Sequence, residues 1–311
     1  MLAHSTDDSA FNLTAEGLIN AFTVDVEDYF QVSAFERDIN RDIWDTFEHR
    51  VVSNTSRMLD LLAKHRVTAT FFVLGWTARR FPELVRKIDA AGHEIASHGF
   101  WHHLVYEQTS EEFRQDICES RDLLADLIDK PVTIYRAPSF SITDHSAWAL
   151  EILAEEGFTT DCSVFPIHHD RYGMPDAEPI VHQRWTPSGN LVEFPPAVLR
   201  CKRVNLPVGG GGYFRLLPLH CVTACLRHIL RAAKMPFMFY VHPWEIDPAQ
   251  PKVSAGNCLS RFRHRVNLSR TYAKLEHLLT QFRFGTVTDS VKSVGDLLDR
   301  GVPSANCGRK S

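Results

Sequence analysis

Between residues 92 and 103 the sequence runs Gly92-His93-Glu94-Ile95-Ala96-Ser97-His98-Gly99-Phe100-Trp101-His102-His103. Its first five residues form a short apolar run that predicts a buried strand. His98 and His102 follow the strand end four residues apart, so both imidazoles lie on one face if the chain turns helically there. Two such nitrogens can bind one cation. The chain has 16 histidines among 311 residues, so a close pair also arises by chance. Further ligands must therefore come from elsewhere in the sequence.

The composition is that of an ordinary globular protein, with 44% hydrophobic and 23% charged residues. A length of 311 residues exceeds a typical single domain, but barrels of alternating strands and helices reach this size as one unit. A net charge of −4 gives no basic footprint, so nucleic acid is not an expected partner. Arginines do gather locally, and a solvated helix face or the rim of an anionic-substrate site explains them best: Arg261, Arg263, Arg265 and Arg270.

Several features predict a cytoplasmic protein. Residues 1–12 lack the long apolar segment of a secretory signal. No run of 18 apolar residues predicts a transmembrane helix. The seven cysteines are an odd number without paired Cys-x-x-Cys spacing, which favours reduced thiols. Cys221 and Cys225 are interpreted as packing residues rather than ligands. The sequence leaves the oligomeric state open.

Strand-like and helix-like segments alternate along the chain. Expected strands are 21–24, 68–73, 92–96, 133–135, 159–161, 237–241 and 284–287. Expected helices are 54–64, 81–91, 110–128, 147–156, 219–233 and 270–281, and Thr109 with Glu112 forms a capping-box pattern before the third. This order predicts an α/β fold with a parallel sheet, either a barrel or a doubly wound sheet.

The expected organisation is an N-terminal segment 1–20, a single barrel domain 21–298 with a C-terminal helix–strand extension, and a flexible tail 299–311. Residues 166–212 hold much of the proline and glycine and show no clear periodicity. Within them, Gly209–Gly212 lacks the Lys-Ser/Thr pair of a phosphate-binding loop. A flexible loop that serves as a lid on the substrate side is the expectation for this run.

Polar residues follow the carboxyl ends of five expected strands: Asp25, His98, Arg136, Asp161 and His242. In a barrel of parallel strands all of these ends open on one face, so the residues meet in one pocket. This convergence predicts a catalytic site.

These motifs resemble those of a known family. Five segments are similar in order and strand-end placement to the motifs of the polysaccharide deacetylases, carbohydrate esterase family four: Thr23-Val24-Asp25-Val26-Glu27-Asp28, His98-Gly99-Phe100-Trp101-His102, Arg136-Ala137-Pro138, Asp161-Cys162-Ser163 and Tyr240-Val241-His242. The phrases that begin at Asp25 and His242 further resemble a branch linked to bacterial exopolysaccharide gene clusters. The resemblance implies a distorted (β/α)7 barrel.

The resemblance also implies roles for individual residues. His98 and His102 would supply metal-ligating nitrogens, and an acid from residues 25–28 an oxygen. Asp25 resembles the general base that takes a proton from water, with Arg136 paired to its carboxylate. His242 resembles the general acid that protonates the departing amine.

Asp161 would hydrogen-bond the imidazole of His242 and favour its protonated form. The same residue has a plainer interpretation, because Asp-x-Ser is common in turns. A backbone N–H after Pro138, that of Ser139, would help to stabilise the oxyanion.

The acidic metal ligand stays open between Glu27 and Asp28. The family's first motif has two adjacent aspartates, whereas here Val26 separates Asp25 from Glu27. An extended strand points Asp25 and Glu27 to the same face, which favours Glu27. A chain that turns directly after Val26 would favour Asp28 instead.

The expected function is that of a metal-dependent hydrolase that removes N-acetyl groups from an amino-sugar saccharide in exopolysaccharide or cell-envelope glycan biosynthesis. Zn²⁺ is the expected metal, with Co²⁺, Mn²⁺ and Ni²⁺ as alternatives. Two other functions suit the same fold: an allantoinase-like hydrolase of cyclic amides, and a catalytically inactive glycan-binding protein.

Overall fold

The computed structural model describes residues 17–169, 171–201 and 204–299. Over these residues one nine-stranded sheet has the order β10-β1-β2-β3-β4-β5-β7-β6, and β11 pairs with the first residues of β1 on the side opposite β10. The pairs are parallel except for the hairpin β6–β7. The strands are β1 (Asn20–Val26), β2 (Thr70–Val73), β3 (Glu94–Ser97), β4 (Ile134–Tyr135), β5 (Thr160–Asp161), β6 (His182–Thr186), β7 (Gly189–Glu193), β10 (Met238–Val241) and β11 (Phe284–Gly285).

The sheet curls into a distorted barrel whose two ends meet at an irregular seam. Between β7 and β10 the connection consists of isolated parallel bridges, Pro196 with Met238 and Gly210 with Tyr240. The N–H of Ala197 donates to the carbonyl oxygen of Met238 over 3.0 Å. The fold is therefore the expected distorted (β/α)7 barrel, with this seam in place of a regular ladder.

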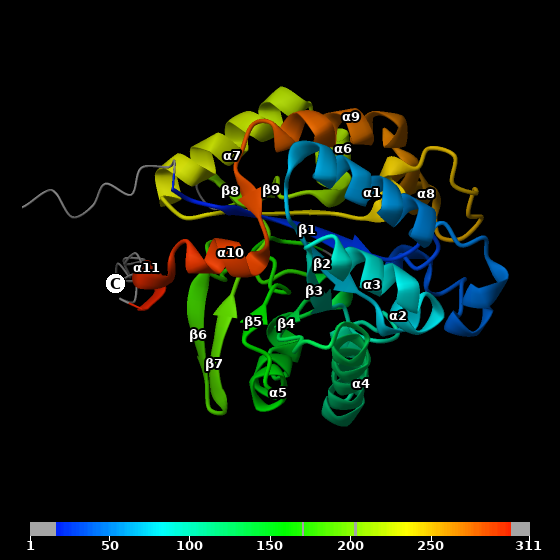
Figure 1. Cartoon of the computed structure of the whole chain (residues 1–311), viewed down its shortest axis with the longest axis horizontal. Coiled ribbons are helices and arrows are strands. Elements are labelled where there is room, and N and C mark those ends of the chain that lie inside the picture. Colours follow the sequence, from blue (N-terminus) through cyan, green and yellow to red (C-terminus); the bar gives the residue numbers. More distant parts are fainter. Residues whose placement is uncertain (1–16, 170, 202–203, 300–311) are drawn as a thin grey trace, which may run out of the picture.

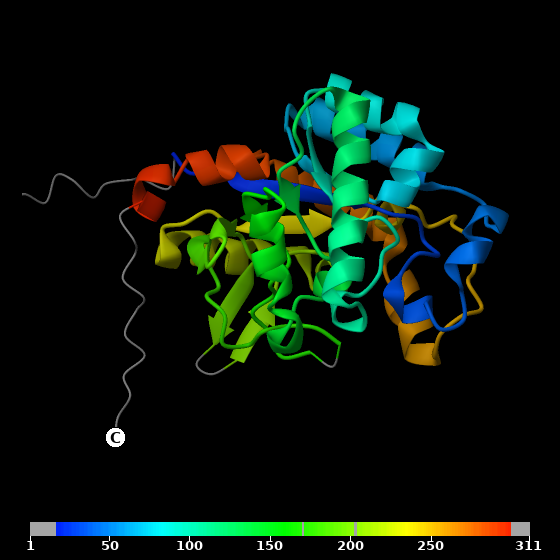
Figure 2. The same ribbon diagram turned by 90° about the horizontal axis from the view of Figure 1, so that it is seen from below.

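Helices surround the sheet, as Figures 1 and 2 show. They are α1 (Val51–His65), α2 (Gly75–Arg80), α3 (Pro82–Ala90), α4 (Ser110–Ile128), α5 (Ala149–Glu155), α6 (Gly211–Leu216), α7 (Leu219–Ala233), α8 (Cys258–Arg265), α9 (Leu268–Leu279), α10 (Val287–Lys292) and α11 (Gly295–Asp299). Short 3-10 helices are η2 (Ser33–Phe35), η3 (Arg41–Thr46), η4 (Val105–Glu107), η5 (Pro138–Phe140), η6 (Asp144–Ser146) and η7 (Pro243–Ile246). The capping box of Thr109 and Glu112 at the start of α4 is confirmed.

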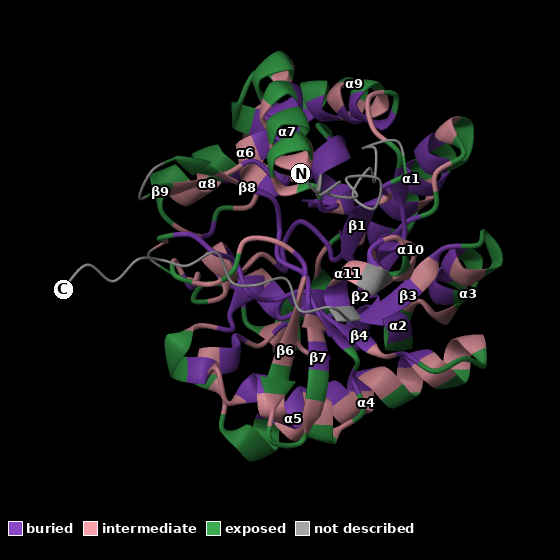
Figure 3. Cartoon of the chain, turned by 90° about the vertical axis from the view of Figure 1, so that its left-hand side faces the viewer, coloured by how far each residue is buried: buried purple, intermediate pink, exposed green. Residues whose placement is uncertain are grey.

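The interior of the fold lies along β1, β2 and β10, all of whose residues are buried (Figure 3). Strands buried on both faces are continuous apolar runs, and β2, Thr-Phe-Phe-Val, fits that description. Phe22, Phe71 and Phe239 belong to the largest apolar cluster, which also includes residues of α1, α3, α7 and α9. Among the described residues no helix has the length and apolarity required to cross a bilayer.

Residues 166–212 are more ordered than their composition suggests. They contain the hairpin β6–β7 and a second hairpin, β8 (Val198–Cys201) with β9 (Val204–Pro207). The expected lid at Gly209–Gly212 is wrong, because this run packs directly on β10. The N–H of Tyr240 donates to the oxygen of Gly209 over 2.7 Å. A Cβ at Gly210, whose φ is +138°, would lie 1.9 Å from the oxygen of Tyr240. Glycine is required there by this close approach.

The two ends of the chain are only partly described. Residues 1–16 of the expected N-terminal segment and 300–311 of the expected tail lie outside the described residues, as does Cys307. Helix α11 extends to Asp299. The described cysteines are free thiols, namely Cys118, Cys162, Cys201, Cys221, Cys225 and Cys258. The single-domain boundaries 21–298 stay a prediction.

Candidate metal centre and its neighbours

Three buried side chains converge at the carboxyl ends of β1 and β3: Glu27, His98 and His102. One ligand atom from each lies within 4.8 Å of the others. Nε2 of His102 is 2.8 Å from Oε2 of Glu27. Nδ1 of His98 donates to the carbonyl oxygen of Arg136 over 2.8 Å, which leaves its Nε2 as the free acceptor. Of the two acids that the sequence left open, the structure brings Glu27 to the histidines.

The donor set fits a divalent cation. Oε2 of Glu27 is buried, and Nε2 of His102 lies 2.8 Å away from it. A buried carboxylate oxygen is normally satisfied. Two imidazole nitrogens and one carboxylate are a common ligand set for Zn²⁺ with open positions.

The loop between the two histidines is not helical, so the expected helical turn is wrong. Gly99 has φ +73° and His102 has φ +56°, and these left-handed residues bend the chain so that both imidazoles face Glu27. Asp116 of α4 fixes the loop, because its carboxylate accepts from the N–H groups of Phe100 (2.7 Å) and Trp101 (3.2 Å). A Cβ at Gly99 would lie 2.7 Å from Oδ2 of Asp116. Sequence reasoning did not identify Asp116, since nothing in the motif points to α4.

Asp28 lies next to the metal group in sequence but points elsewhere, so its assignment as a possible ligand is corrected. Its Oδ2 accepts from the N–H groups of Arg50 (2.7 Å) and Val51 (3.0 Å) at the start of α1. Its Oδ1 accepts from the N–H of Tyr29 over 2.9 Å. These are helix N-terminal amides that need an acceptor, which makes Asp28 a structural cap.

Replacing Asp28 by alanine is expected to destabilise the fold by about 2 kcal/mol, because the amides at the start of α1 lose their acceptor. Zn²⁺ affinity should stay that of the wild type. Urea unfolding and metal titration measure the two effects separately. Glu27→Ala, the matched control, should show the opposite pattern, with metal affinity lost. Loss of metal binding in Asp28→Ala at full folding would contradict this assignment.

Asp25 and Arg136 form a buried ion pair beside the metal group. Nη1 of Arg136 donates to Oδ1 of Asp25 and, over 2.9 Å, to Oγ1 of Thr23. The guanidinium carbon lies 3.9 Å from the ring centroid of Phe72. Arg136 has no exposed surface, so these partners must offset the cost of burying its charge. The pair is the one that the sequence predicted, and it fixes the orientation of the Asp25 carboxylate.

His242 lies on the other side of the same carboxylates. Its Nε2 is 3.4 Å from Oε1 of Glu27 and 3.8 Å from Oδ2 of Asp25. Its Nδ1 is 2.6 Å from Oε1 of Glu245, whose Oε2 accepts from Nε of Arg215 over 2.6 Å. A chain of contacts thus runs from Arg215 through Glu245 to the imidazole.

The charges in this group shift two pKa values far from their usual range. Burial alone would lower the pKa of His242, but the carboxylates of Glu27 and Glu245 outweigh it and raise the pKa to about 9. Burial alone would raise the pKa of Glu27, but His102 and His242 outweigh it and lower the pKa to about 2. Without a cation, the imidazolium of His242 therefore faces an ionised Glu27.

Asp161 does not contact His242, so its predicted role is corrected. Its carboxylate accepts from Oγ (2.6 Å) and N–H (3.0 Å) of Ser163. Oγ of Ser163 in turn accepts from the N–H of Ala137 over 2.7 Å, so Asp161 supports the backbone after Arg136. The reason is topological, because β5 pairs with β4 and β7, away from β10.

Glu245 takes the place at Nδ1 that was expected for Asp161. The sequence signal was present, because residues three apart meet across a 3-10 turn. Glu245 follows His242 by three positions and closes a capping box on η7. A local partner was therefore available without any long-range contact.

Replacing Glu245 by glutamine is expected to lower kcat by about tenfold or more. It should also move the alkaline limb of the pH–rate profile to lower pH, because the carboxylate that stabilises the imidazolium is lost. Asp161→Asn should leave that limb in place. The measurement is the pH dependence of kcat for both variants, with thermal unfolding as the check on folding. If the alkaline limb of the pH–rate profile moved in Asp161→Asn and not in Glu245→Gln, the assignment of Glu245 as the partner of His242 would be wrong.

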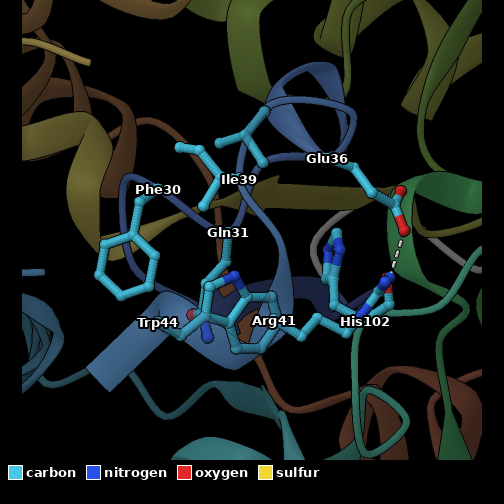
Figure 4. Close-up of a pocket in the computed structure, with 8 residues that line it drawn as sticks. Phe30, Gln31, Glu36, Ile39, Arg41, Trp44 and His102 are labelled. Atoms are coloured by element: carbon cyan, nitrogen blue, oxygen red, sulfur yellow. Dashed lines mark hydrogen bonds and ion pairs between the residues drawn. The ribbon is translucent and has the colours of Figure 1, made fainter. Parts of the chain in front are cut away.

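Two cavities flank the loop that carries the histidines. Figure 4 shows the smaller one, of about 10 Å³, lined by His102 together with Phe30, Gln31, Val32, Glu36, Ile39, Arg41 and Trp44. A cavity of this size holds about one water molecule. A larger one, of about 380 Å³, is lined by Glu36, Arg41, Trp101, His103, Glu107, Gln108, Glu112, Gln115, Asp116 and Glu119. Arg41 lines both cavities and donates to the carbonyl oxygens of Trp101 (2.6 Å) and His102 (3.1 Å).

Comparison with known proteins gives two adjacent family matches. Residues 37–159 match the family described as polysaccharide deacetylase. Residues 162–292 match a domain of unknown function, DUF3473. The first match contains both candidate histidine ligands and Arg136, and the second contains His242 and Glu245.

Among curated proteins, the chain is similar to a peptidoglycan-N-acetylglucosamine deacetylase of Bacillus cereus, 34% identical over 98 residues, which are 31% of this chain and 36% of that protein. It is also similar to a chitooligosaccharide deacetylase of Rhizobium leguminosarum bv. trifolii, 31% identical over 114 residues, which are 37% of this chain and 49% of that protein. The matches thus span half or less of these relatives' own length.

Two solved structures share the fold. One is a candidate polysaccharide deacetylase from Mycobacterium smegmatis, with a TM-score of 0.57, 18% identity, and coverage of 91% of this chain and 90% of that chain. The other is PuuE allantoinase, with a TM-score of 0.60, 14% identity, and coverage of 90% of this chain and 91% of that chain. At these identities the likeness is one of fold. Residues 37–159 of the chain are thus similar in sequence to the polysaccharide deacetylase family, and the residues that follow match DUF3473.

Proposed function

We propose that the protein is a metal-dependent deacetylase that hydrolyses the N-acetyl group of an amino-sugar saccharide and releases acetate and a free amine. One observation carries this proposal: a candidate cation site, a carboxylate oriented by arginine and an imidazole oriented by glutamate share one buried group. Oδ2 of Asp25 and Oε1 of Glu27 both lie within 3.8 Å of Nε2 of His242. Hydrolysis of an amide needs a base for the water and an acid for the amine, and this group supplies both.

Glu27, His98 and His102 would hold the cation. When bound, it would supply Lewis-acid polarisation of the acetyl carbonyl and lower the pKa of water toward neutrality. Asp25 accepts the proton of the attacking water, and Arg136 holds its carboxylate in place. His242 donates a proton to the nitrogen of the departing amine. Glu245 holds Nδ1 of that imidazole, so that Nε2 carries the proton to be donated.

Zn²⁺ is the proposed metal, because two imidazoles and one carboxylate suit it. Co²⁺, Mn²⁺ and Ni²⁺ accept the same ligands, since imidazole and carboxylate do not by themselves select one of these ions. Metal analysis of the protein purified without added metal, followed by reloading with each ion, identifies the native one.

The proposed substrate class is tested by product assay with the Zn²⁺-loaded protein. Acetate release from N-acetylated chito-oligosaccharide is expected, and ring opening of allantoin is not. The comparison matters because PuuE allantoinase shares the fold. Allantoin hydrolysis without acetate release would favour the cyclic-amide reaction. Binding of the oligosaccharide by metal-loaded protein without any turnover would favour the inactive glycan-binding protein. The exopolysaccharide setting rests on the resemblance of the motifs at Asp25 and His242.

A further inference from the structure

The segment from Pro248 to Leu275 has an unusual charge for this protein. It contains neither Asp nor Glu, although the whole chain has a net charge of −4. Its basic residues are Lys252, Arg261, Arg263, Arg265, Arg270 and Lys274. Three of the six, Arg261, Arg263 and Arg265, lie in α8. The segment is therefore a local positive region on an acidic protein.

Helix α8 combines these arginines with exposed apolar side chains. Leu259 is 54% exposed and Phe262 is 58% exposed. At 100° per residue, the two lie in the middle of the solvent-facing side, with Arg263 on one flank and Arg261 and Arg265 on the other. We call these five residues the α8 surface. An apolar centre between basic flanks is typical of helices that lie in a membrane interface.

The arginines of the α8 surface are not neutralised by the protein. Over the described residues none of them forms an ion pair with a carboxylate. Arg261 donates to the carbonyl oxygen of Gly256 over 2.6 Å, and Arg265 to that of Gln250 over 3.5 Å. Two carboxylates contact this segment through its backbone before the helix begins: Asp247 accepts from the N–H of Ala249 over 3.0 Å, and Asp38 from that of Gly256 over 2.6 Å. The positive charge is thus available to an external anion.

The opposite side of α8 is anchored to the candidate active site. His264 is buried and stacks on Trp244 at 4.5 Å between ring centroids, and Trp244 stacks on His242 at 5.2 Å. Nη1 of Arg215 donates to the carbonyl oxygens of His264 (2.9 Å) and Val266 (3.0 Å). Figures 1 and 2 place α8 at the periphery, beside the blue segment that follows β1. One indole therefore separates this helix from the imidazole.

We infer that the α8 surface docks the protein on an anionic phospholipid bilayer, with Phe262 and Leu259 inserted among the headgroups and the arginines bound to lipid phosphates. The exposed apolar centre favours a bilayer over an acidic polysaccharide, which would offer charge without an apolar phase. Docking itself does not depend on catalysis. If the proposed deacetylase function holds, docking brings the site close to saccharides carried on membrane lipids.

Sedimentation of the full chain with vesicles tests the inference. Binding is expected to phosphatidylcholine vesicles that contain phosphatidylglycerol and not to phosphatidylcholine alone, and it should weaken as salt is raised. Arg263→Gln with Arg265→Gln should weaken binding by about 25-fold, about fivefold for each arginine. Phe262→Ser should weaken it by about tenfold. Matched controls are Arg231→Gln on α7 and Leu216→Ser on α6, an exposed arginine and an exposed leucine that are not part of the α8 surface.

The inference is overturned by equal binding to both kinds of vesicle, or by an equal loss in the control variants. A second result would also overturn it: the protein does not bind vesicles of either kind but binds polygalacturonate, and Phe262→Ser leaves the binding to polygalacturonate unchanged. Thermal unfolding confirms that each variant is folded. Vesicle binding needs neither metal nor substrate, and acetate release from a soluble oligosaccharide should be unchanged in all of these variants. Failure of docking is thereby distinguished from failure of the proposed activity.

Discussion

Replacing Asp25 by asparagine is expected to lower kcat for acetate release by about 10²-fold or more while leaving the metal bound. Asparagine has the size of aspartate but cannot accept the proton of water. The Glu27–His98–His102 group does not include this side chain, so metal affinity should persist. Steady-state kinetics on metal-loaded protein, with metal content measured on the same sample, gives both quantities.

Asp28→Asn is the matched control for Asp25→Asn. It changes the same residue type at the same strand end, but its carboxylate contacts the backbone of α1. Its kcat should stay near that of the wild type. Asp25→Asn also leaves the charge of Arg136 without its carboxylate partner, so thermal unfolding must show that the variant is folded at the assay temperature. A folded, metal-loaded Asp25→Asn protein with wild-type kcat would exclude Asp25 as the base.

Replacing His98 by alanine is expected to abolish both metal binding and activity. Removal of a partner outside the ligand shell already weakens metal affinity by about 10- to 100-fold, and loss of a ligand should exceed that. Isothermal titration with Zn²⁺ measures the affinity. Chelation of the wild-type metal should reproduce the same loss of activity, and added Zn²⁺ should restore the wild type but not the variant.

His103→Ala is the matched control for His98→Ala. His103 follows the ligand His102 directly, but it lines the larger cavity and does not belong to the metal group. It should therefore retain Zn²⁺ affinity. Equal loss of metal in both variants would point to collapse of the loop rather than removal of a ligand.

The sequence predicted the parts of the site that depend on strand geometry. Side chains two apart on an extended strand share a face, and this favoured Glu27 over Asp28 beside Asp25. The carboxyl ends of parallel strands meet on one face, and this brings Arg136 to Asp25 and His242 to Asp25 and Glu27. The capping box at the start of α4 depends on local contacts alone, so it too could be predicted from the sequence.

The sequence could not predict what depends on packing between distant elements. Asp116 fixes the histidine loop from the middle of α4, and no pattern in the loop indicates it. The separation of Asp161 from His242 follows from which strands are neighbours in the sheet. The seam at Gly210 requires the backbone of Tyr240 to approach it, which a glycine run alone does not reveal. The short strands β6 to β9 were not predicted, because the proline and glycine residues among them interrupt the alternation of apolar and polar residues.

We propose that one cation is held by Glu27, His98 and His102 at the mouth of the barrel. Anomalous diffraction from crystals of the Zn²⁺-loaded protein, collected at the zinc edge, tests it most directly. A single strong peak is expected, bonded to Nε2 of both histidines and to the carboxylate of Glu27. A peak at any other group of side chains, or none in crystals of active protein, would contradict it.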